Sequence, residues 1–151
     1  MKYYLALLAV PALMSSTLAA ADSKDEVVAK FQQFVVAQNA HDLASVRRML
    51  GDGQEFVWVT RGAIVQGAGA ATDRFRTLYQ GTWRLTPTGE PQIFVIDART
   101  VQLVAPVTFR IGPLGETATD TPFLLAQLWR RTGRDWRIVS LLPIPIPLNS
   151  R

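Results

Sequence analysis

Apolar residues recur at helical spacing in two stretches of the first half of the chain. Residues 23–26 precede the first stretch, and their Ser and Glu three positions apart are typical of a capping box at a helix start. Residues 39–42 break this helix, and Asp42 can cap the second. The apolar stripes are Val27, Phe31, Phe34 and Val35 in the first helix and Leu43, Val46, Met49 and Leu50 in the second. Both stretches are predicted to be amphipathic helices.

The pattern then changes to one that predicts a third helix and a run of strands. Residues 55–60 read as a strand, residues 64–66 as its return and residues 67–79 as the third helix. Five strand-like stretches follow, at 82–86, 92–97, 101–111, 119–131 and 136–142, and the chain finishes as a proline-rich extended tail. Three N-terminal helices followed by such strands predict an α+β fold. The helices would pack on a strongly bent, mostly antiparallel sheet, a cone with room for an apolar pocket.

The first residues have the pattern of an export signal. Lys2 supplies the positive start, residues 5–14 form a short apolar run, and residues 19–21 are three alanines of the kind found at a cleavage site. We therefore expect a signal peptide at 1–21, one domain at 22–151, and a periplasmic or secreted location. The alternative is a buried N-terminal helix. The apolar run is too short to span a bilayer, and without cysteine a lipoprotein anchor is excluded, so no stable membrane anchor is expected.

Composition narrows the chemistry further. The formal net charge is +4, but Lys and Arg are spread along the chain, so we expect no nucleic-acid partner. With no Cys and one His, disulfides are excluded, and His/Cys metal sites lack ligands. The twelve acidic residues are scattered, so no oxygen-ligand metal site is predicted. Gly67-Ala68-Gly69 lacks the third glycine of a nucleotide loop, since Thr72 stands there. We expect no cofactor.

Three stretches carry a resemblance to a known superfamily. Residues 37–43, Ala-Gln-Asn-Ala-His-Asp-Leu, look like the family's turn between its first two helices. Gly67 with Ala70, Ala71 and Phe75 looks like its third helix start, and residues 122–142 look like its closing strand pair. The chain resembles the nuclear-transport-factor-2-like superfamily, which includes ketosteroid isomerase and the SnoaL-like proteins. The resemblance implies a cone-shaped, cystatin-like fold over essentially the whole of 22–151.

The same resemblance implies that the catalytic groups of ketosteroid isomerase are missing. That enzyme uses a tyrosine on the first helix, an aspartate on the first strand and a protonated aspartate on a late strand. The matching positions hold Phe34, Trp58 and Ala126, none of which can do those tasks. His41 beside Asp42 invites a general-base role, but the matching family residue is a glycine in a helix–helix turn, which favours a capping or surface role. No catalytic residue is predicted.

Strand alternation assigns side chains to the two faces of the sheet. Counting from Ala126, we place Pro122, Leu124 and Leu128 on the concave side. The predicted ligand-binding residues are Phe34, Gln38, Trp58, Phe75, Tyr79, Leu124, Ala126, Leu128, Val139 and Leu141, with Arg61 at the pocket mouth. Two alternatives remain: these side chains contact an apolar ligand, or they fill the cone as core. Gln38 would orient the ligand or satisfy backbone groups at the helix end.

The alternate residues of the two closing strands, which we expect on the outer face of the sheet, are also mostly apolar. They include Phe123, Leu125, Gln127, Trp129, Trp136 and Ile138. Such an outer face is too apolar for a soluble monomer, so we predict a sheet-to-sheet homodimer through these residues. The alternative is that the tail, residues 143–147, folds back over the patch.

Three functions follow as hypotheses. The first is an exported domain that binds an apolar small molecule without chemistry of the ketosteroid isomerase type. The second is an isomerase, dehydratase or cyclase acting on an apolar cyclic substrate, and the third is a structural dimeric module with a filled cone. An open cavity would favour a ligand, and a carboxylate such as Asp97 or Asp120 inside it would favour an enzyme.

Overall fold

The computed structural model describes the backbone of residues 12–147 and the side chains from Ala21 to Pro147. Three helices and seven strands follow one another in the predicted order. The helices are α1 (Ala12–Asn39), α2 (Leu43–Met49) and α3 (Ala68–Leu78). The strands are β1 (Val57–Thr60), β2 (Ala63–Gln66), β3 (Thr82–Pro87), β4 (Gln92–Asp97), β5 (Thr100–Gly112), β6 (Thr119–Thr132) and β7 (Asp135–Pro145).

All seven strands belong to one mixed sheet. Its order is β2-β1-β7-β6-β5-β3, and β4 pairs with the other half of the long strand β5. Every pairing is antiparallel except that of β1 with β7, which is parallel. The long strand β5 therefore pairs with two shorter strands, β4 along its first half and β3 along its second.

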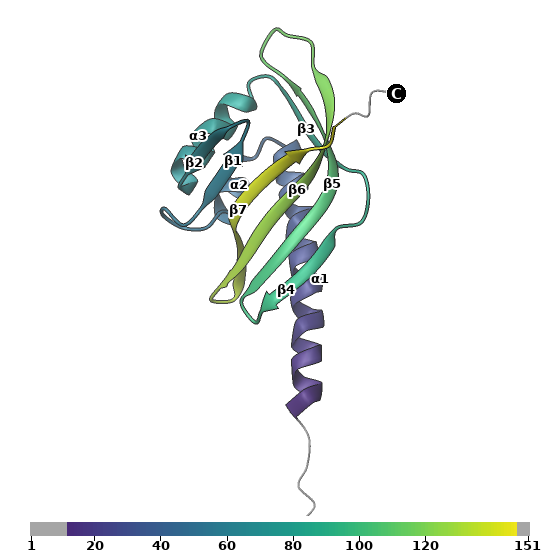
Figure 1. Ribbon diagram of the computed structural model, residues 1–151. Coiled ribbons are helices and arrows are strands. Elements are labelled where there is room, and N and C mark those ends of the chain that lie inside the picture. Colours follow the sequence, from purple (N-terminus) through teal and green to yellow (C-terminus); the bar gives the residue numbers. More distant parts are fainter. Residues whose placement is uncertain (1–11, 148–151) are drawn as a thin grey trace, which may run out of the picture.

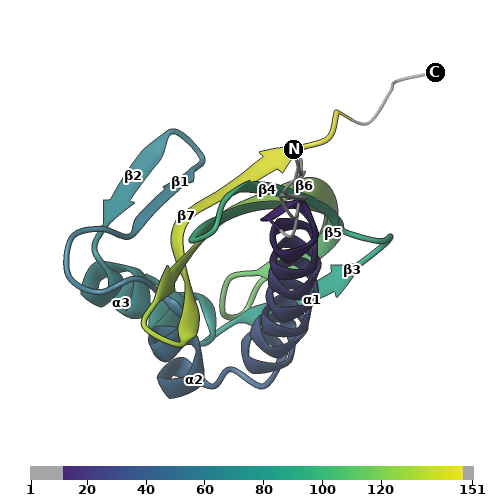
Figure 2. The same cartoon turned by 90° about the horizontal axis from the view of Figure 1, so that it is seen from below.

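The helices lie together on the concave side of this sheet. Figure 1 shows α1 running along the sheet, and Figure 2, from below, shows the strands curving around it. The stripe predicted for α1 is buried, with Val27, Phe31 and Phe34 at 2 % exposure or less. The sheet contributes β3 and β5 side chains such as Leu85 and Leu103 to the same core. The predicted α+β cone is confirmed.

The start of α1 differs from the expected one. The helix already runs at Ala12, so Ser23 lies inside it rather than at its cap. Residues 1–11 of the predicted signal peptide lie outside the described residues, and the structure does not test cleavage after Ala21. No helix in the described range is both long and apolar enough to cross a membrane.

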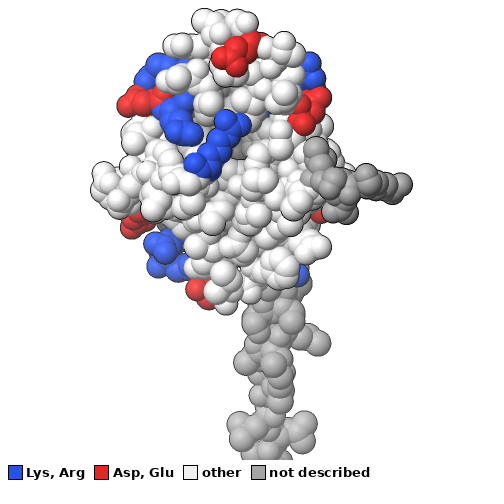
Figure 3. Space-filling view, turned by 45° about the horizontal axis from the view of Figure 1, so that its top comes forward, with Lys and Arg blue, Asp and Glu red and all other residues white. Residues whose placement is uncertain are grey.

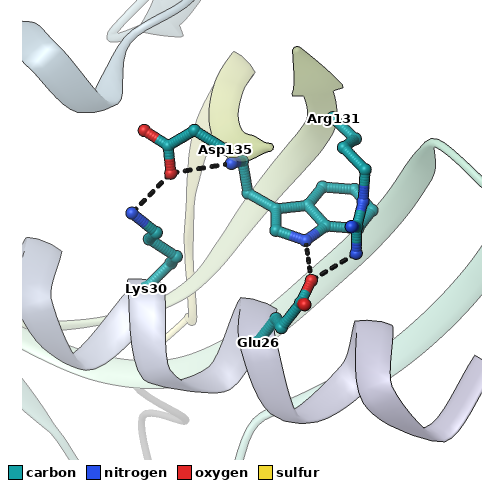
Figure 4. A network of polar contacts seen from close by, with 5 residues as sticks. Glu26, Lys30, Arg131 and Asp135 are labelled. Atoms are coloured by element: carbon teal, nitrogen blue, oxygen red, sulfur yellow. Dashed lines mark hydrogen bonds and ion pairs between the residues drawn. The ribbon is translucent and has the colours of Figure 1, made fainter. Parts of the chain in front are cut away.

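A polar cluster joins α1 to the hairpin between β6 and β7 (Figure 4). Glu26 pairs with Arg131 and accepts a hydrogen bond from Trp136 Nε1 at 2.6 Å. The Arg131 guanidinium lies 4.7 Å from the Trp136 ring centroid. Lys30, one turn further along α1, pairs with Asp135 at 2.5 Å. The Glu26 side chain thus fixes α1 to the hairpin instead of closing a capping box.

The face assignment on β6 is wrong. Phe123, Leu125 and Trp129 point into the core at 8 %, 1 % and 0 % exposure, whereas Leu124 is 39 % exposed on the outer face. Ala126 and Leu128 share the outer parity and are half-buried there. The sequence could not decide this, because both parities of β6 are apolar and alternation fixes a face only relative to one known residue.

A β-bulge explains the corresponding error on β7. Leu128 pairs with Ser140 and Trp129 pairs with Ile138, so Val139 is an extra residue opposite a continuous β6. The bulge lets Trp136 and Ile138 face inward before it and Leu141 face inward after it. All six residues predicted for the dimer interface, namely Phe123, Leu125, Gln127, Trp129, Trp136 and Ile138, are buried within the protomer.

Candidate functional site

A cavity opens between the helices and the concave face of the sheet. Its volume is about 60 Å³, and aromatic side chains dominate its lining. A water needs at least about 10–15 Å³ of such space, so the cavity holds several waters. The fifteen lining residues are Phe34, Gln38, Trp58, Thr60, Arg61, Arg74, Phe75, Leu78, Trp83, Phe109, Ile111, Phe123, Leu125, Leu141 and Pro143.

The structure brings together part of the predicted site. Six of its residues line the cavity: Phe34, Gln38, Trp58, Phe75, Leu141 and, at the mouth, Arg61. Leu124, Ala126 and Leu128 lie on the outer face instead, and Val139 is the bulge residue, whose Cγ1 lies 3.1 Å from where a Gly51 Cβ would stand. Tyr79 lies behind the lining, where its hydroxyl donates to Gln38.

Reasoning from sequence missed several lining residues. Phe123 and Leu125 were assigned to the wrong face. Trp83 and Phe109 alternate with polar neighbours on β3 and β5, a signal that could have placed them inward. Arg74 directly precedes Phe75 on α3. Apolar periodicity identifies the buried apolar residues of a helix, so it could not show that the side chain of a neighbouring arginine lines the cavity.

Gln38 is the polar centre of the inner wall. It is 1 % exposed, and its Oε1 accepts from Tyr79 Oη at 2.9 Å and from Trp83 Nε1 at 2.8 Å. Tyr79 in turn stacks on His41 with ring centroids 4.5 Å apart. Burial of the Tyr79 hydroxyl, helped by the nearby charge of Asp42, raises its pKa far above the usual value for tyrosine. Tyr79 therefore stays protonated and holds the Gln38 carbonyl.

Trp58 forms the wall between the sheet and α3. Its ring stacks on Phe75 with centroids 4.6 Å apart, and the Arg74 guanidinium carbon lies 5.3 Å from the indole centroid. The Trp58 indole nitrogen is buried and has no hydrogen-bond partner within residues 12–147. The sequence places these groups together because β1 leads through a short hairpin into Gly67, whose positive φ of 87° starts α3 directly above β1.

The mouth of the cavity is basic. Arg61, in the β1–β2 turn with φ of 48°, is exposed, and Arg74 is half-buried beside it in the lining. No Asp or Glu is among the lining residues. Figure 3 shows basic side chains on the upper part of one molecular face, with acidic ones toward its edges. The site therefore combines an apolar interior with positive charge at its opening.

The positions that match the ketosteroid isomerase groups hold no proton-transfer group. Phe34 and Trp58 line the cavity, as the resemblance implied, but Ala126 points outward and Leu125 lines the cavity beside it. Asp97 accepts a hydrogen bond from the Arg99 amide in the β4–β5 turn, and Asp120 pairs with Arg110 on the outer face. Neither carboxylate enters the cavity.

His41 lies in the turn between α1 and α2. It adopts a positive φ of 55°, which fits the glycine of the matching family turn. Its Nε2 is 3.1 Å from the Trp83 carbonyl oxygen, and its side chain is exposed. Among the described residues, no three His, Cys, Asp or Glu side chains gather as metal ligands would.

Comparisons with known proteins define the fold. No family model matches the chain, and no curated protein matches its sequence. A nuclear transport factor 2-like superfamily protein from Salmonella enterica superposes with a TM-score of 0.77 at 14% identity, over 87% of this chain and 96% of that one.

Two further solved structures are similar. A hexachlorocyclohexane dehydrochlorinase, LinA type 2, gives a TM-score of 0.73 at 12% identity, covering 89% of this chain and 95% of its own. An uncharacterised protein with a cystatin-like fold from Caulobacter vibrioides gives 0.70 at 13%, covering 85% and 93%. The chain has the nuclear-transport-factor-2-like, cystatin-like fold. Enzymes and proteins of unknown function share this fold, so it does not itself assign an activity.

Proposed function

We propose that this protein is an exported domain that binds an apolar small molecule in its cone, without chemistry of the ketosteroid isomerase type. The observation that carries the proposal is an open cavity walled by Phe34, Trp58, Phe75, Trp83 and Phe109. Ligand sites are typically concave and mostly apolar, with a few polar groups that orient the ligand. Gln38 and Arg74 are such groups here.

The cavity also bears on the competing functions. A filled structural cone would leave no such space, whereas this one is open at Arg61. An isomerase, dehydratase or cyclase would need a group that moves a proton within reach of its substrate. None of the lining residues carries a carboxylate or an imidazole. Binding is therefore the better-supported function.

Native mass spectrometry tests the binding function directly. The protein is purified from the periplasm or medium of its own source, and one co-purifying apolar compound is expected. Substituting Ile111→Trp, a half-buried residue of the lining, should exclude that compound by filling the cavity. Ile64→Trp, on exposed β2 outside the cavity, is the matched control and should retain it. A wild-type protein that carries no compound, and binds none from an extract, would contradict the proposal.

We also propose that the protein is a homodimer through the outer face of the sheet, as the sequence indicated, but with other residues at the interface. On the outer side of the sheet, Leu124 and Ile144 are 39 % and 48 % exposed and pair across β6 and β7. The outer patch consists of Val104, Leu124, Ala126, Leu128, Leu142 and Ile144. The proposal rests on these residues forming one apolar surface with two exposed aliphatic side chains at its centre, since contiguous exposed apolar patches often mark association surfaces.

The tail does not cover this patch within the described residues. Residues 143–145 continue β7 in register with β6, and the Ile146 amide donates to the Pro122 carbonyl at 3.0 Å. The tail thus extends strand β7 within the sheet instead of crossing its outer face. The outer patch is left available to a second copy.

A further inference from the structure

Among the described residues, six buried side-chain donors have no hydrogen-bond partner, and three of them belong to residues that line the cavity. These three are Gln38 Nε2, Trp58 Nε1 and Arg74 Nε. All three residues line the same cavity. Buried polar groups are nearly always paired, so three unpaired donors in one cavity indicate the place of an absent partner.

The orientation of Gln38 is fixed by its neighbours. The Trp83 indole nitrogen can only donate, so the Gln38 atom 2.8 Å from it must be the amide oxygen. The Tyr79 hydroxyl donates to that same oxygen. The Gln38 carbonyl is therefore fully used, and the amide NH₂ is left to donate to something in the cavity.

Trp58 and Arg74 add donors of the same kind. An indole N–H and a guanidinium can donate but never accept. The Trp58 side chain is 3 % exposed, so its N–H has no ready access to bulk water. Thr60, at 9 % exposure, is the one lining hydroxyl, and it can both donate and accept. The unpaired polar groups of the cavity are thus almost all donors, and a ligand that satisfies them must supply hydrogen-bond acceptors.

The charge of the site points in the same direction. Arg61 and Arg74 both line the cavity, and within the described part of the chain neither forms an ion pair. The other arginine near this end of α3, Arg76, pairs with Asp73 outside the cavity. Two uncompensated guanidinium groups favour an anion over a neutral acceptor, because charge-assisted hydrogen bonds are the stronger kind.

We propose that the cone binds a small apolar carboxylate. Its carboxylate accepts from Arg74, Trp58 and Gln38, and its hydrocarbon body lies against Phe34, Phe109 and Leu125. This assignment rests on the proposed binding function and adds the ligand's head group to it. A cavity of about 150 Å³ holds a benzene ring, so this one of about 60 Å³ takes a short branched chain, and a ring would extend past Arg61.

A matched probe series tests the head group. Benzoate, toluene and benzylammonium share a ring, and 3-methylbutanoate, 2-methylbutane and 3-methylbutylammonium give a second, smaller body. Binding to the full protein is followed by NMR at the Trp58 indole N–H, which is assigned as the signal missing from Trp58→Phe. Each carboxylate is expected to bind at least about tenfold more tightly than its hydrocarbon and ammonium counterparts and to shift that signal downfield.

Variants separate the head-group contact from general stability. Arg74→Gln should weaken carboxylate binding about tenfold and change hydrocarbon binding less than about twofold. Arg76→Gln on the same helix, exposed and outside the cavity, should change neither.

Each result bears on one proposal or both. If the hydrocarbons bind as tightly as the carboxylates, or Arg74→Gln weakens both equally, the carboxylate assignment is wrong while apolar binding stands. Tighter binding of the ammonium probes would likewise overturn it. If no probe of either body binds, the carboxylate assignment is wrong, whereas the binding function is decided separately by whether an apolar compound co-purifies.

Discussion

At the residue scale, the inner wall depends on one amide. Gln38 accepts from Tyr79 and Trp83, residues that follow it by 41 and 45 positions, and so ties α1 to the end of α3 and to β3. The sequence singled out Gln38 as the polar residue on an apolar stripe, but left open whether it served a ligand or the helix end. The structure shows a third role, because its oxygen serves two side chains on other elements.

Replacing this amide should therefore destabilise the fold. Gln38→Leu keeps the volume but leaves the Trp83 indole N–H and the Tyr79 hydroxyl without an acceptor. Each buried donor left unsatisfied costs about 1–3 kcal/mol, so urea unfolding should show a loss of that order or larger. Gln32→Leu, on the exposed side of α1, is the control and should change the free energy of unfolding by less than about 0.5 kcal/mol. Equal losses in the two variants would contradict this role.

Tyr79 predicts how stability changes at high pH. Burial of its hydroxyl, with the charge of Asp42, raises its pKa in the fold above the value of 10.0 that it has when unfolded. A raised folded pKa means that the stabilising contribution is complete below pH 10 and is lost as pH rises through the folded pKa. Unfolding free energies measured between pH 8 and pH 11 should therefore fall more steeply for wild type than for Tyr79→Phe. Parallel curves would show that Tyr79 does not couple ionisation to folding.

At the element scale, polar contacts as well as core packing hold the middle of α1 against the turn end of the β6–β7 hairpin. The helix supplies Glu26 and Lys30, and the hairpin supplies Arg131, Asp135 and Trp136 (Figure 4). Burial of Asp135 raises its pKa, but its hydrogen bond to Lys30 and the Lys30 charge lower it by more, so the net pKa is below the usual range. Its contribution is present above the unfolded pKa and is lost as pH falls through the folded one.

The neighbouring acids of α1 provide a matched test of this cluster. Glu26→Ala removes the partner of both Arg131 and the Trp136 indole N–H and should destabilise the protein by about 1 kcal/mol, since the pair is partly solvated. Asp25→Ala changes an exposed carboxylate one position earlier and should have less than half that effect. The difference between the variants should shrink in 1 M salt, as thermal unfolding can show. A difference independent of salt would mean that packing, rather than charge, accounts for it.

How far the sequence predicted this molecule depends on the element. Helical periodicity predicted the buried stripe of α1 but not its start, the third helix was predicted close to the bounds of α3, and turn residues indicated the order of the strands. On β6, however, Leu124 and Leu125 are equally apolar, and the polar residue in the middle of the strand, Gln127, lies on the buried side, so alternation there did not indicate the solvent face. On β7, the extra residue Val139 breaks the alternation locally, and a bulge without glycine has no sequence signature. The helix-borne site residues were therefore placed correctly more often than those on the closing strands.

At the scale of the whole molecule, the proposed homodimer rests on the apolar outer patch. Its centre lies at Leu124 and Ile144, away from the cavity and its mouth. An association through this patch would pack the outer sheet faces of two copies against each other and leave Arg61 exposed. The tryptophans first assigned to that interface instead build the core of each protomer.

Sedimentation of the protein lacking residues 1–21 tests this assembly at tens of micromolar. The unaltered protein should sediment as a dimer, and Leu124→Glu should give a monomer because it places a charge in the apolar contact. Leu114→Glu, in the exposed β5–β6 loop, is the matched control and should remain dimeric. A wild-type monomer at these concentrations would contradict the homodimer, and a dimeric Leu124→Glu would place its interface elsewhere.

The bulge at Val139 also has a consequence for how the chain tolerates change. It splits β7 into two segments that are out of phase, so that Trp136 and Ile138 face the core before it and Leu141 lines the cavity after it. Deleting Val139 would place Ile138 directly before Ser140, opposite Trp129 and Leu128, and both segments would keep the faces they have now. We therefore expect β7 to tolerate the loss of one residue at Val139, whereas the same loss within β6, which has no extra residue, would turn one part of that strand over.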